Sequence, residues 1–368
     1  MLQSPIKVGD SRSNLIWEAA VIAWDKAPMV NRAVLACIKE TSQRTMDCIE
    51  PFRNKVILLM GNFRQTCPVV CWGTKAQVID ASIKSSALWP LFKVHTLTQP
   101  ICNLANLEFT LFVDTIGDGA GPDICLDGML DIVTNPEDLM SFVYPMEILQ
   151  DSVKCLKCSI LCPTNIQVDF YNNTLLKRID RVECTYHAAD SLKEVDEAGL
   201  VTPDSTLDYV AKHPPGFPHS NLIAKTGGVY HLMWNMLIDQ GLMKNVRVVV
   251  IGVGNRIIMV QLLRGVGGVS VINSEDILLP RISFIADLTS GHTLLQKQFP
   301  LTPVYATIFN SCQGLTLNWM GVELTRPIFS HGQLYTALSW IHHWMHAKVR
   351  LRPGEIITQN VTYHDILM

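Results

Sequence analysis

The sequence predicts an α/β protein with parallel sheets. Residues 56–60 form a short, wholly apolar run closed by Gly61, and residues 21–29 contain a second apolar run followed by Asp25. Runs of this kind are typical of strands buried on both faces of a parallel sheet. Residues 31–49, between the two runs, carry apolar side chains at helical spacing, so we expect a helix there.

The same periodicities assign the remaining elements. They predict helices over residues 77–84, 107–116, 135–143, 166–179 and 329–340, and strands over residues 92–97, 157–162 and 304–309. Gly254-Asn255 separates two β-branched arms within residues 246–263, which predicts a hairpin. With the apolar runs at 269–272 and 282–285, this hairpin suggests a small β-barrel. Residues 203–220 are rich in Pro and polar residues and are expected to form a loop.

Composition limits the class of protein. The 368 residues suffice for about two domains, and 48% of them are hydrophobic. Charged residues make up 17%, below the roughly 25% of typical soluble proteins. The net charge of −3 provides no global basic field for a nucleic-acid partner, which leaves a local basic groove open.

Targeting signals are not evident in the sequence. Residues 1–14 lack the apolar core of a signal peptide. The most apolar region, residues 246–272, is interrupted by Arg256, Arg264 and several glycines, so we expect no membrane span. Eleven scattered cysteines predict reduced thiols in an intracellular compartment.

Polar residues follow both apolar runs of the first hundred residues. Asp25 follows the first run, and Asn62-Phe63-Arg64-Gln65 follows Gly61 after the second. Because α/β sheets bind ligands beyond the carboxyl ends of their strands, these residues are candidates for ligand chemistry. In nucleotide hydrolases, an acid at such a strand end holds Mg²⁺ on the phosphates.

The two strand ends and six further motifs resemble the Pif-like (petite-integration-frequency) ATP-dependent DNA helicases, most closely the helicase branch carried by Helitron transposons. The further motifs follow in the family's order: SSALWP (85–90), TIGDG (115–119), PTN (163–165), QFPL (298–301), QGLTL (313–317) and FSHGQLYTALS (329–339). Each is weak alone, but the ordered set is specific and covers most of the chain.

The resemblance implies a particular architecture. The fold would be two RecA-like domains of the P-loop NTPase class, with a small β-barrel insertion in the second. Residues 1–96 would be the carboxyl-terminal half of the first domain. Residues 97–368 would be the second domain, with the insertion at about 216–290.

The resemblance also implies a function. The family couples ATP hydrolysis to 5′-to-3′ movement on single-stranded or duplex DNA, in repair, recombination, telomere maintenance or Helitron transposition, and a nuclear location follows from it. Asp25 would hold Mg²⁺, and Gln65, Gln313 and Gly314 would face ATP. The residues expected near DNA are Phe63, Arg64, Thr164, Asn165 and His331.

The chain departs from the family's pattern where catalysis needs charge. The 368 residues contain no Gly-Lys dipeptide, so the phosphate-binding loop and the front half of the first domain are expected to be absent. Lys26 replaces the family's general base, which is worth about 10²–10⁴ in rate. The other degenerate positions are Asn62, Cys102, Ser311 and Trp340, where the family has Asp, Arg, Lys and Arg. We therefore predict a catalytically impaired chain, in which Mg²⁺ and ATP binding is not expected to be efficient.

Two alternatives remain beside a decayed, inactive helicase. One is a non-catalytic protein that keeps a DNA-binding or protein-binding surface. The other is an active helicase whose phosphate-binding loop lies in an upstream exon or a partner chain, against which Lys26 and Trp340 argue. An incomplete sheet exposes a strand edge, so we also predict poor solubility.

Three weaker patterns compete with these readings. Gly252-Val253-Gly254 mimics a dinucleotide-binding fingerprint, but Ile257 stands where the third glycine belongs. Cys155, Cys158 and Cys162 could hold zinc with His187 or His213, although buried thiols fit better. The cluster His342, His343 and His346 is expected to be a partly exposed helix face rather than a metal site.

Overall fold

The computed structural model describes residues 2–53, 55–71, 73–97, 106–194, 214, 216–266, 269–272, 275–288, 292–313, 315, 317–341 and 343–367. The chain divides into two compact units. Unit 1 contains Met1–Ile132, Phe309–Leu315 and Leu324–Met368, and unit 2 contains Val133–Ile308 and Thr316–Glu323. The predicted boundary between residues 96 and 97 falls inside unit 1, and the predicted division into two RecA-like domains stays a prediction.

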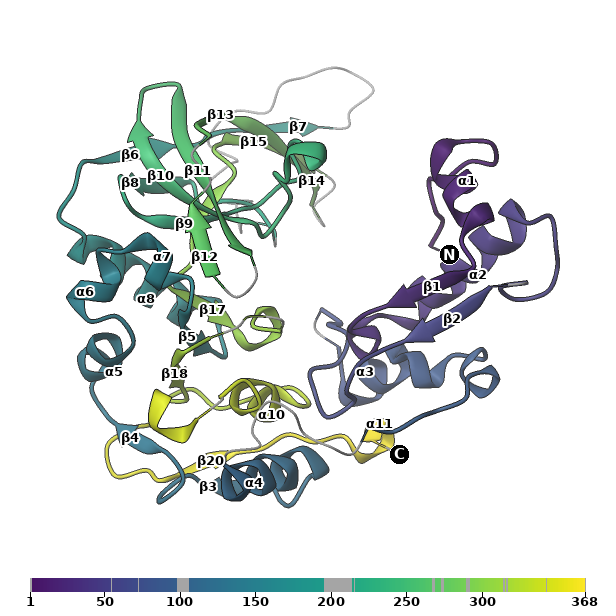
Figure 1. Ribbon diagram of the computed structural model, residues 1–368, viewed down its shortest axis with the longest axis horizontal. Coiled ribbons are helices and arrows are strands. Elements are labelled where there is room, and N and C mark those ends of the chain that lie inside the picture. The colour runs from purple at the N-terminus through teal and green to yellow at the C-terminus, as the bar shows by residue number, and fades with distance from the viewer. Residues whose placement is uncertain are drawn as a thin grey trace. The chain divides into compact units, whose positions relative to one another are not determined.

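Unit 1 is built around a pair of parallel strands. Strand β1 (Val21–Trp24) pairs with β2 (Val56–Leu59), and α2 (Arg32–Thr45) lies between them in the sequence (Figure 1). The Asn31 side chain caps α2 by accepting a hydrogen bond from the Ala33 amide. Both predicted strands and the predicted helix are thereby confirmed.

The expectation that these strands are buried on both faces is wrong. On one face, Trp24, Ile57 and Leu59 pack against a small core that includes the buried Leu35. Side chains on the other face, such as Val56, are exposed. The strands alternate because β1 and β2 form a two-stranded sheet covered on a single side.

The rest of unit 1 is mostly helical. Its elements are α1 (Ser11–Glu18), α3 (Lys75–Ala81), α4 (Leu107–Asp118), α10 (Gln333–Leu338), α11 (His364–Leu367), β19 (Ala347–Arg350), and the antiparallel pair β3 (Asp123–Cys125) and β20 (Ile357–Gln359). Strand β4 (Asp131–Val133) lies where the chain passes from unit 1 to unit 2.

The predicted strand at residues 92–97 is wrong. These residues follow a 3-10 turn, Trp89–Leu91, and have no regular structure. Residues 93–97 are all exposed, so the stretch has no sheet face to bury. The aromatic rings of Trp89 and Phe92 pack together at 6.2 Å instead.

Unit 2 contains a parallel sheet in which the central strand is wholly buried. Strand β5 (Cys158–Cys162) pairs in parallel with β17 (Ala306–Ile308) and with β18 (Trp319–Glu323). The strands predicted at residues 157–162 and 304–309 are thereby confirmed. The unit's helices are α5 (Pro136–Val143), α6 (Met146–Leu149), α7 (Ser152–Cys155) and α8 (Asn165–Arg178).

Antiparallel strands make up the remainder of unit 2. They are β6 (Glu183–His187), β7 (Ala189–Glu194), β8 (Asn221–Lys225), β9 (Val229–Leu232), β10 (Arg247–Val253), β11 (Ile257–Val266), β12 (Val269–Ile272), β13 (Ile277–Pro280), β14 (Ile282–Asp287), β15 (His292–Gln298) and β16 (Leu301–Pro303). One sheet has the order β12-β11-β10-β9-β16, with β13 beside β11, and another has the order β14-β15-β7.

The predicted hairpin at Gly254-Asn255 is confirmed, because β10 and β11 pair antiparallel on either side of it. Gly252 lies within β10, at a bulge, and a second strand follows where a dinucleotide-binding fingerprint needs a helix.

Antiparallel strands also occur on both sides of the insertion predicted at about residues 216–290. Strand β6, which precedes that range, pairs with β8, and β15, which follows it, pairs with β7. Most of the predicted loop at 203–220 lies outside the described residues. Within the described ranges, no helix is long and apolar enough to cross a membrane.

Candidate functional site

The carboxyl ends of β1 and β2 lie at one edge of the parallel pair. Asp25 and Lys26 follow β1, and Gly61 follows Met60 at the end of β2. The two loops approach closely, because the Ala27 amide donates to the Met60 carbonyl at 2.9 Å. A Cβ atom on Gly61 would lie 2.2 Å from Cδ of Pro28, so only glycine permits this approach.

Lys26 occupies the centre of this edge. Its backbone is left-handed, with φ of 57°, and its ammonium group donates to the Gln313 carbonyl at 3.2 Å. The exposed Asp25 carboxylate accepts a hydrogen bond from the Lys26 amide at 2.9 Å. The predicted magnesium ligand is thus followed by a side chain that donates hydrogen bonds and carries a positive charge.

Gln313 connects Lys26 to a buried pair of threonines. Its Nε2 donates to Thr66 Oγ1 at 3.2 Å, and the Thr66 amide donates to Thr336 Oγ1 at 3.1 Å. Its Oε1 is buried and has no hydrogen-bond partner within the described part of the chain. Gln65 precedes Thr66 and its amide closes a turn onto the Asn62 carbonyl at 3.1 Å. The structure therefore brings the segments of Asp25, Gln65 and Gln313 together.

The predicted nucleotide contact Gly314 and the degenerate position Cys102 lie outside the described residues. Ser311 is exposed at the end of a 3-10 turn. The Trp340 indole N–H is buried without a hydrogen-bond partner among the residues that the structure describes.

Arg64, predicted to contact DNA, makes two ion pairs with α4. Its guanidinium lies 2.7 Å from Asp114 and 2.8 Å from Asp118, and the side chain is only partly exposed. Burial alone would lower the pKa of Arg64, but the two carboxylates outweigh it and raise that pKa. One terminal nitrogen of the guanidinium donates to Asp114 and the other donates to Asp118.

Phe63 and His331, also predicted near DNA, are joined by a hydrogen bond between the His331 ring and the Phe63 carbonyl. The Phe63 ring packs edge-on against Trp89, with centroids 5.5 Å apart. The fully buried His331 accepts the Tyr363 amide at Nδ1, so its Nε2 carries the proton and donates to the Phe63 carbonyl, both at 2.8 Å. These internal bonds use both ring nitrogens of His331. The contacts of Phe63 and His331 with DNA stay a prediction.

Thr164 and Asn165 belong to unit 2. They follow β5 at its carboxyl end, where Asn165 begins α8 and is exposed. The Thr164 hydroxyl donates to Gln167 Oε1 at 2.8 Å. Their position suits ligand contact in an α/β sheet, and their role at DNA stays a prediction.

Comparisons with known proteins place this geometry in a family. The PIF1-like helicase family model matches residues 2–121, which include the whole of the β1–β2 edge except Gln313. Over 183 residues, the chain is 29% identical to the human ATP-dependent DNA helicase PIF1, and it is 27% identical over 179 residues to the rat protein of that name. Each match covers 49% of this chain and 25% of the relative.

These matches support a relationship of the chain to the Pif1-like helicase family.

Solved Pif1 structures share the fold at low sequence identity. A Bacteroides Pif1 helicase in complex with ADP-AlF3 and ssDNA has a TM-score of 0.66 and 17% identity, over 99% of this chain and 76% of that one. The Candida albicans Pif1 helicase has a TM-score of 0.63 and 18% identity, over 96% and 77%. The RecA-like P-loop NTPase fold predicted from the sequence is therefore confirmed.

Asp25 of this Pif1-like chain does not by itself form a magnesium site. Mg²⁺ in phosphate-transfer sites is held by one or two carboxylates together with the substrate's phosphates. Here a single exposed carboxylate already accepts the Lys26 amide, and the adjacent ammonium group would oppose a second cation. The residues present therefore do not fit the family's metal.

The alternative metal sites also lack support. No group of three or more His, Cys, Asp or Glu side chains that could hold a metal ion occurs within the described ranges. Burial raises the pKa of the Cys155 and Cys158 thiols to about 12, which fits buried, protonated thiols. His213 and His342 lie outside the described residues.

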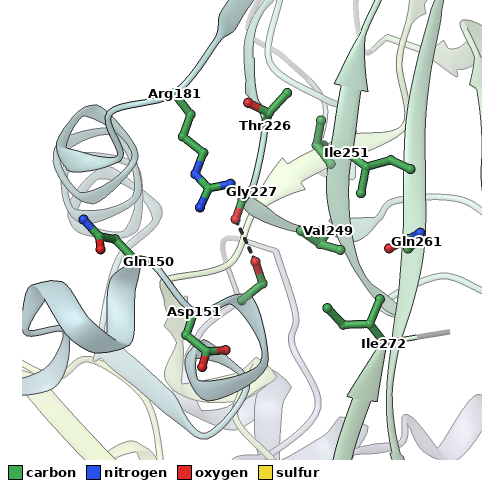
Figure 2. Close-up of a pocket in the computed structure, with 11 residues that line it drawn as sticks. Gln150, Asp151, Arg181, Thr226, Gly227, Val249, Ile251, Gln261 and Ile272 are labelled. Atoms are coloured by element: carbon green, nitrogen blue, oxygen red, sulfur yellow. Dashed lines mark hydrogen bonds between the residues drawn. The ribbon is translucent and has the colours of Figure 1, made fainter. Parts of the chain in front are cut away.

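A cavity of about 510 Å³ in unit 2 involves none of the predicted site residues. It lies between the α6–α7 junction and the antiparallel strands, and Figure 2 shows Arg181 reaching toward Gly227 and Asp151 across it. The Ser152 hydroxyl donates to the Gly227 carbonyl at 2.9 Å and joins the two walls. Its lining combines polar side chains with aliphatic ones such as Ile251, and the described residues that line it include no aromatic ring on which a base could stack.

Sequence reasoning missed the partners that fix this Pif1-like edge. Asp114, Asp118 and Tyr335 hold Arg64 and Asn62, and Thr336 holds Thr66. They are 50 or more residues away in the sequence, where no periodicity or spacing indicates a contact. Gly117 itself was a possible signal in the sequence, because a glycine inside a helix often marks tight packing.

We predict that Gly117→Ala destabilises the protein, although alanine favours helices over glycine by about 1 kcal/mol. The new Cβ would lie 2.6 Å from Cδ2 of Tyr335 and 2.7 Å from Cδ of Arg64. Overpacking of this kind costs about 1–3 kcal/mol. Chemical denaturation should show the loss, whereas Thr115→Ala, at an exposed position of the same helix, should be neutral or stabilising. A stabilised Gly117→Ala variant would contradict the close approach of α4 to Tyr335.

We also predict that His331 makes the fold sensitive to acid. Burial lowers the pKa of His331 below 6.5, so the unfolded state binds a proton that the folded state excludes. Stability should fall as the pH drops from about 6.5 toward the lowered pKa, by about 1.4 kcal/mol for each unit between the two values. His331→Gln, which keeps a donor toward the Phe63 carbonyl, should flatten the fall of unfolding free energy between pH 7 and pH 5. An unchanged slope would show that His331 is protonated or solvated in the fold.

Proposed function

We propose that this chain is a Pif1-like DNA helicase domain that does not turn over ATP by itself and keeps a surface for single-stranded DNA. The observation that carries the proposal is the Lys26 ammonium group, which donates to the Gln313 carbonyl beside Asp25, at the carboxyl edge of the parallel pair. The family's helicase activity is proposed for this chain because of its similarity to the family. The match covers a quarter of the human relative's length.

The chemistry of this edge argues against hydrolysis. ATP hydrolysis needs a base or a polar group that orients water, and an ammonium group at neutral pH can accept no proton. It also needs phosphate-binding backbone with a lysine, and no Gly-Lys dipeptide occurs among the 368 residues. Trp340 stands where the family has an arginine that is worth roughly 10³–10⁵ in rate. These losses act on one transition state, so any two suffice to abolish turnover.

The DNA surface is argued from unit 2. Asn165 is exposed at the carboxyl end of the buried strand β5, beside the polar Thr164. Two solved structures of Bacteroides Pif1, which has the same fold, contain bound ssDNA. A protein that keeps this end of the sheet can bind a strand without hydrolysing ATP, because strand contacts depend on donors and stacking rather than on the nucleotide. With this role we propose a nuclear location and an origin in a Helitron-type transposon.

ATP turnover tests the first half of the proposal. We expect the purified, folded chain to release no phosphate above background, with or without single-stranded DNA, because Lys26 cannot activate water. Phosphate release in a coupled assay is the measurement, with a complete Pif1 helicase as the positive control.

Turnover that single-stranded DNA stimulates and that Asp25→Asn abolishes would overturn the proposed inactivity. Turnover that Asp25→Asn leaves unchanged would point to a contaminating ATPase, and the expected result would then be sought in a cleaner preparation of the same variant.

Binding of single-stranded DNA tests the second half. We expect measurable binding without ATP, whose affinity falls as salt rises, because phosphate contacts release counterions. Asn165→Asp should weaken binding about threefold to tenfold, since it places a negative charge near the phosphates. Asn173→Asp, an equal charge change at an exposed position of the same helix, is the matched control in fluorescence anisotropy. Equal losses in the two variants would contradict a DNA contact at the end of β5.

A further inference from the structure

The cavity in unit 2 has two unlike walls (Figure 2). One wall is the junction of α6 and α7, and the other is one face of the antiparallel sheet. Val249 of β10 pairs with Gln261 of β11, so their side chains lie on the same face of that sheet. Ile251 and Ile272 line the same wall. The sheet therefore contributes mainly aliphatic surface, and the helix junction contributes polar groups.

Arg181 brings a positive charge to this cavity. Its side chain lies over Gly227, because a Cβ atom on that glycine would lie 3.2 Å from Cδ and 3.5 Å from Cζ of Arg181. Arg181 is exposed, and its guanidinium has no hydrogen bond or ion pair with any other residue that the structure describes. A planar guanidinium with free donors is suited to a carboxylate or a phosphate.

The Asp151 carboxylate, which also lines the cavity, does not neutralise Arg181. One of its oxygens caps α7 by accepting hydrogen bonds from the Val153 and Lys154 amides at 3.0 and 3.2 Å. The other oxygen lies 3.6 Å from the Lys154 ammonium group. Since those two charges balance each other, Arg181 leaves the cavity with one uncompensated positive charge. A ligand with a single negative charge would match it.

The uncharged part of the lining selects the rest of the ligand. Val249 is buried and Ile272 is exposed, so an aliphatic chain that lay along this wall would be withdrawn from water together with Ile272. The described lining includes no aromatic ring, which argues against a nucleobase. A volume of about 510 Å³ is typical of sites for small molecules.

We propose that this cavity binds a small aliphatic monocarboxylate. Its carboxylate pairs with the Arg181 guanidinium, and its chain lies along Val249, Ile251 and Ile272. A phosphate monoester fits less well, because it carries a charge of about −2 at neutral pH and would meet the Asp151 carboxylate without a second free cation among the described lining residues. The inference depends on neither ATP nor DNA, so it stands apart from the proposed function.

Titration of the full 368-residue chain with hexanoate, followed by NMR of its isoleucine methyl groups, tests the inference. We expect the methyl signals of Ile251 and Ile272 to shift. Hexanol and hexylamine should bind about tenfold more weakly than hexanoate, because neither can accept a charged pair of hydrogen bonds from a guanidinium. Between butyrate and hexanoate, each methylene that enters the cavity should tighten binding roughly fourfold.

Two variants assign the binding to its residues. Arg181→Gln should weaken hexanoate binding by about tenfold and leave hexanol binding unchanged, because it removes the charge and leaves the aliphatic wall intact. Arg256→Gln, the same change at an exposed position of the β10–β11 turn, is the matched control and should bind as the unmodified chain does. Ile272→Ala should reduce the dependence on chain length, because it removes aliphatic surface from the wall.

Four results would overturn the inference. Hexanol that binds as tightly as hexanoate means that the cavity does not recognise a carboxylate. Equal losses in Arg181→Gln and Arg256→Gln mean that hexanoate responds only to the overall charge of the chain. Hexyl phosphate that binds more tightly than hexanoate means that the anion is a phosphate. Unshifted methyl signals of Ile251 and Ile272 mean that the cavity is not the site. Circular dichroism shows whether the variants fold, and Arg181→Met replaces Arg181→Gln if the latter does not.

Discussion

The loop after β2 holds unit 1 together. Four of the five residues 62–66 connect the parallel pair to segments that lie 50 to 273 positions further along the chain. Their partners are Tyr335 for Asn62, His331 for the Phe63 carbonyl, Asp114 and Asp118 for Arg64, and Thr336 and Gln313 for Thr66. The Arg64 ion pairs are partly exposed and contribute modestly, whereas the buried bonds of Thr66 and His331 cannot be lost without leaving polar groups unsatisfied.

This internal role changes the interpretation of the motif. In a nucleotide hydrolase, the residues beyond a parallel strand are held ready for a ligand. In this chain the same residues bond to other parts of unit 1, and Lys26 adds a further internal bond to the Gln313 carbonyl. The Gln313 Oε1 is the exception, because it is buried and has no partner within the described part of the chain. The strand ends of a nucleotide site are thus kept, while the charged side chains beside them bond to other parts of unit 1.

The two parallel sheets of the chain differ in how they are covered. Strand β5 in unit 2 has neighbours on both sides and is buried along its whole length. Strands β1 and β2 have the same apolar composition, yet one of their faces is exposed. The contrast arises from the number of strands and covering helices rather than from the strands' own sequences.

The sequence by itself determined the elements with strong periodicity. It predicted β1, β2, β5, β17, the helices α2, α4, α5 and α8, and the β10–β11 hairpin, because apolar runs, helical spacing and turn residues act locally. It also indicated the related family, since the ordered motifs survive the loss of individual charges. It misplaced a strand at residues 92–97, where local β propensity had no sheet face to pack against.

Only the tertiary structure decided the use of the polar residues. Arg64 had the chemistry for a phosphate, and the nearness of Asp114 and Asp118 directed it to carboxylates instead. His331 was a candidate for DNA until its burial and its two backbone partners became visible. The exposure of one face of β1 and β2 could not be inferred from the sequence either, because a run such as 56–60 is apolar at every position. Long-range contacts decide what a polar group bonds to and which apolar face is covered, and a sequence pattern records neither.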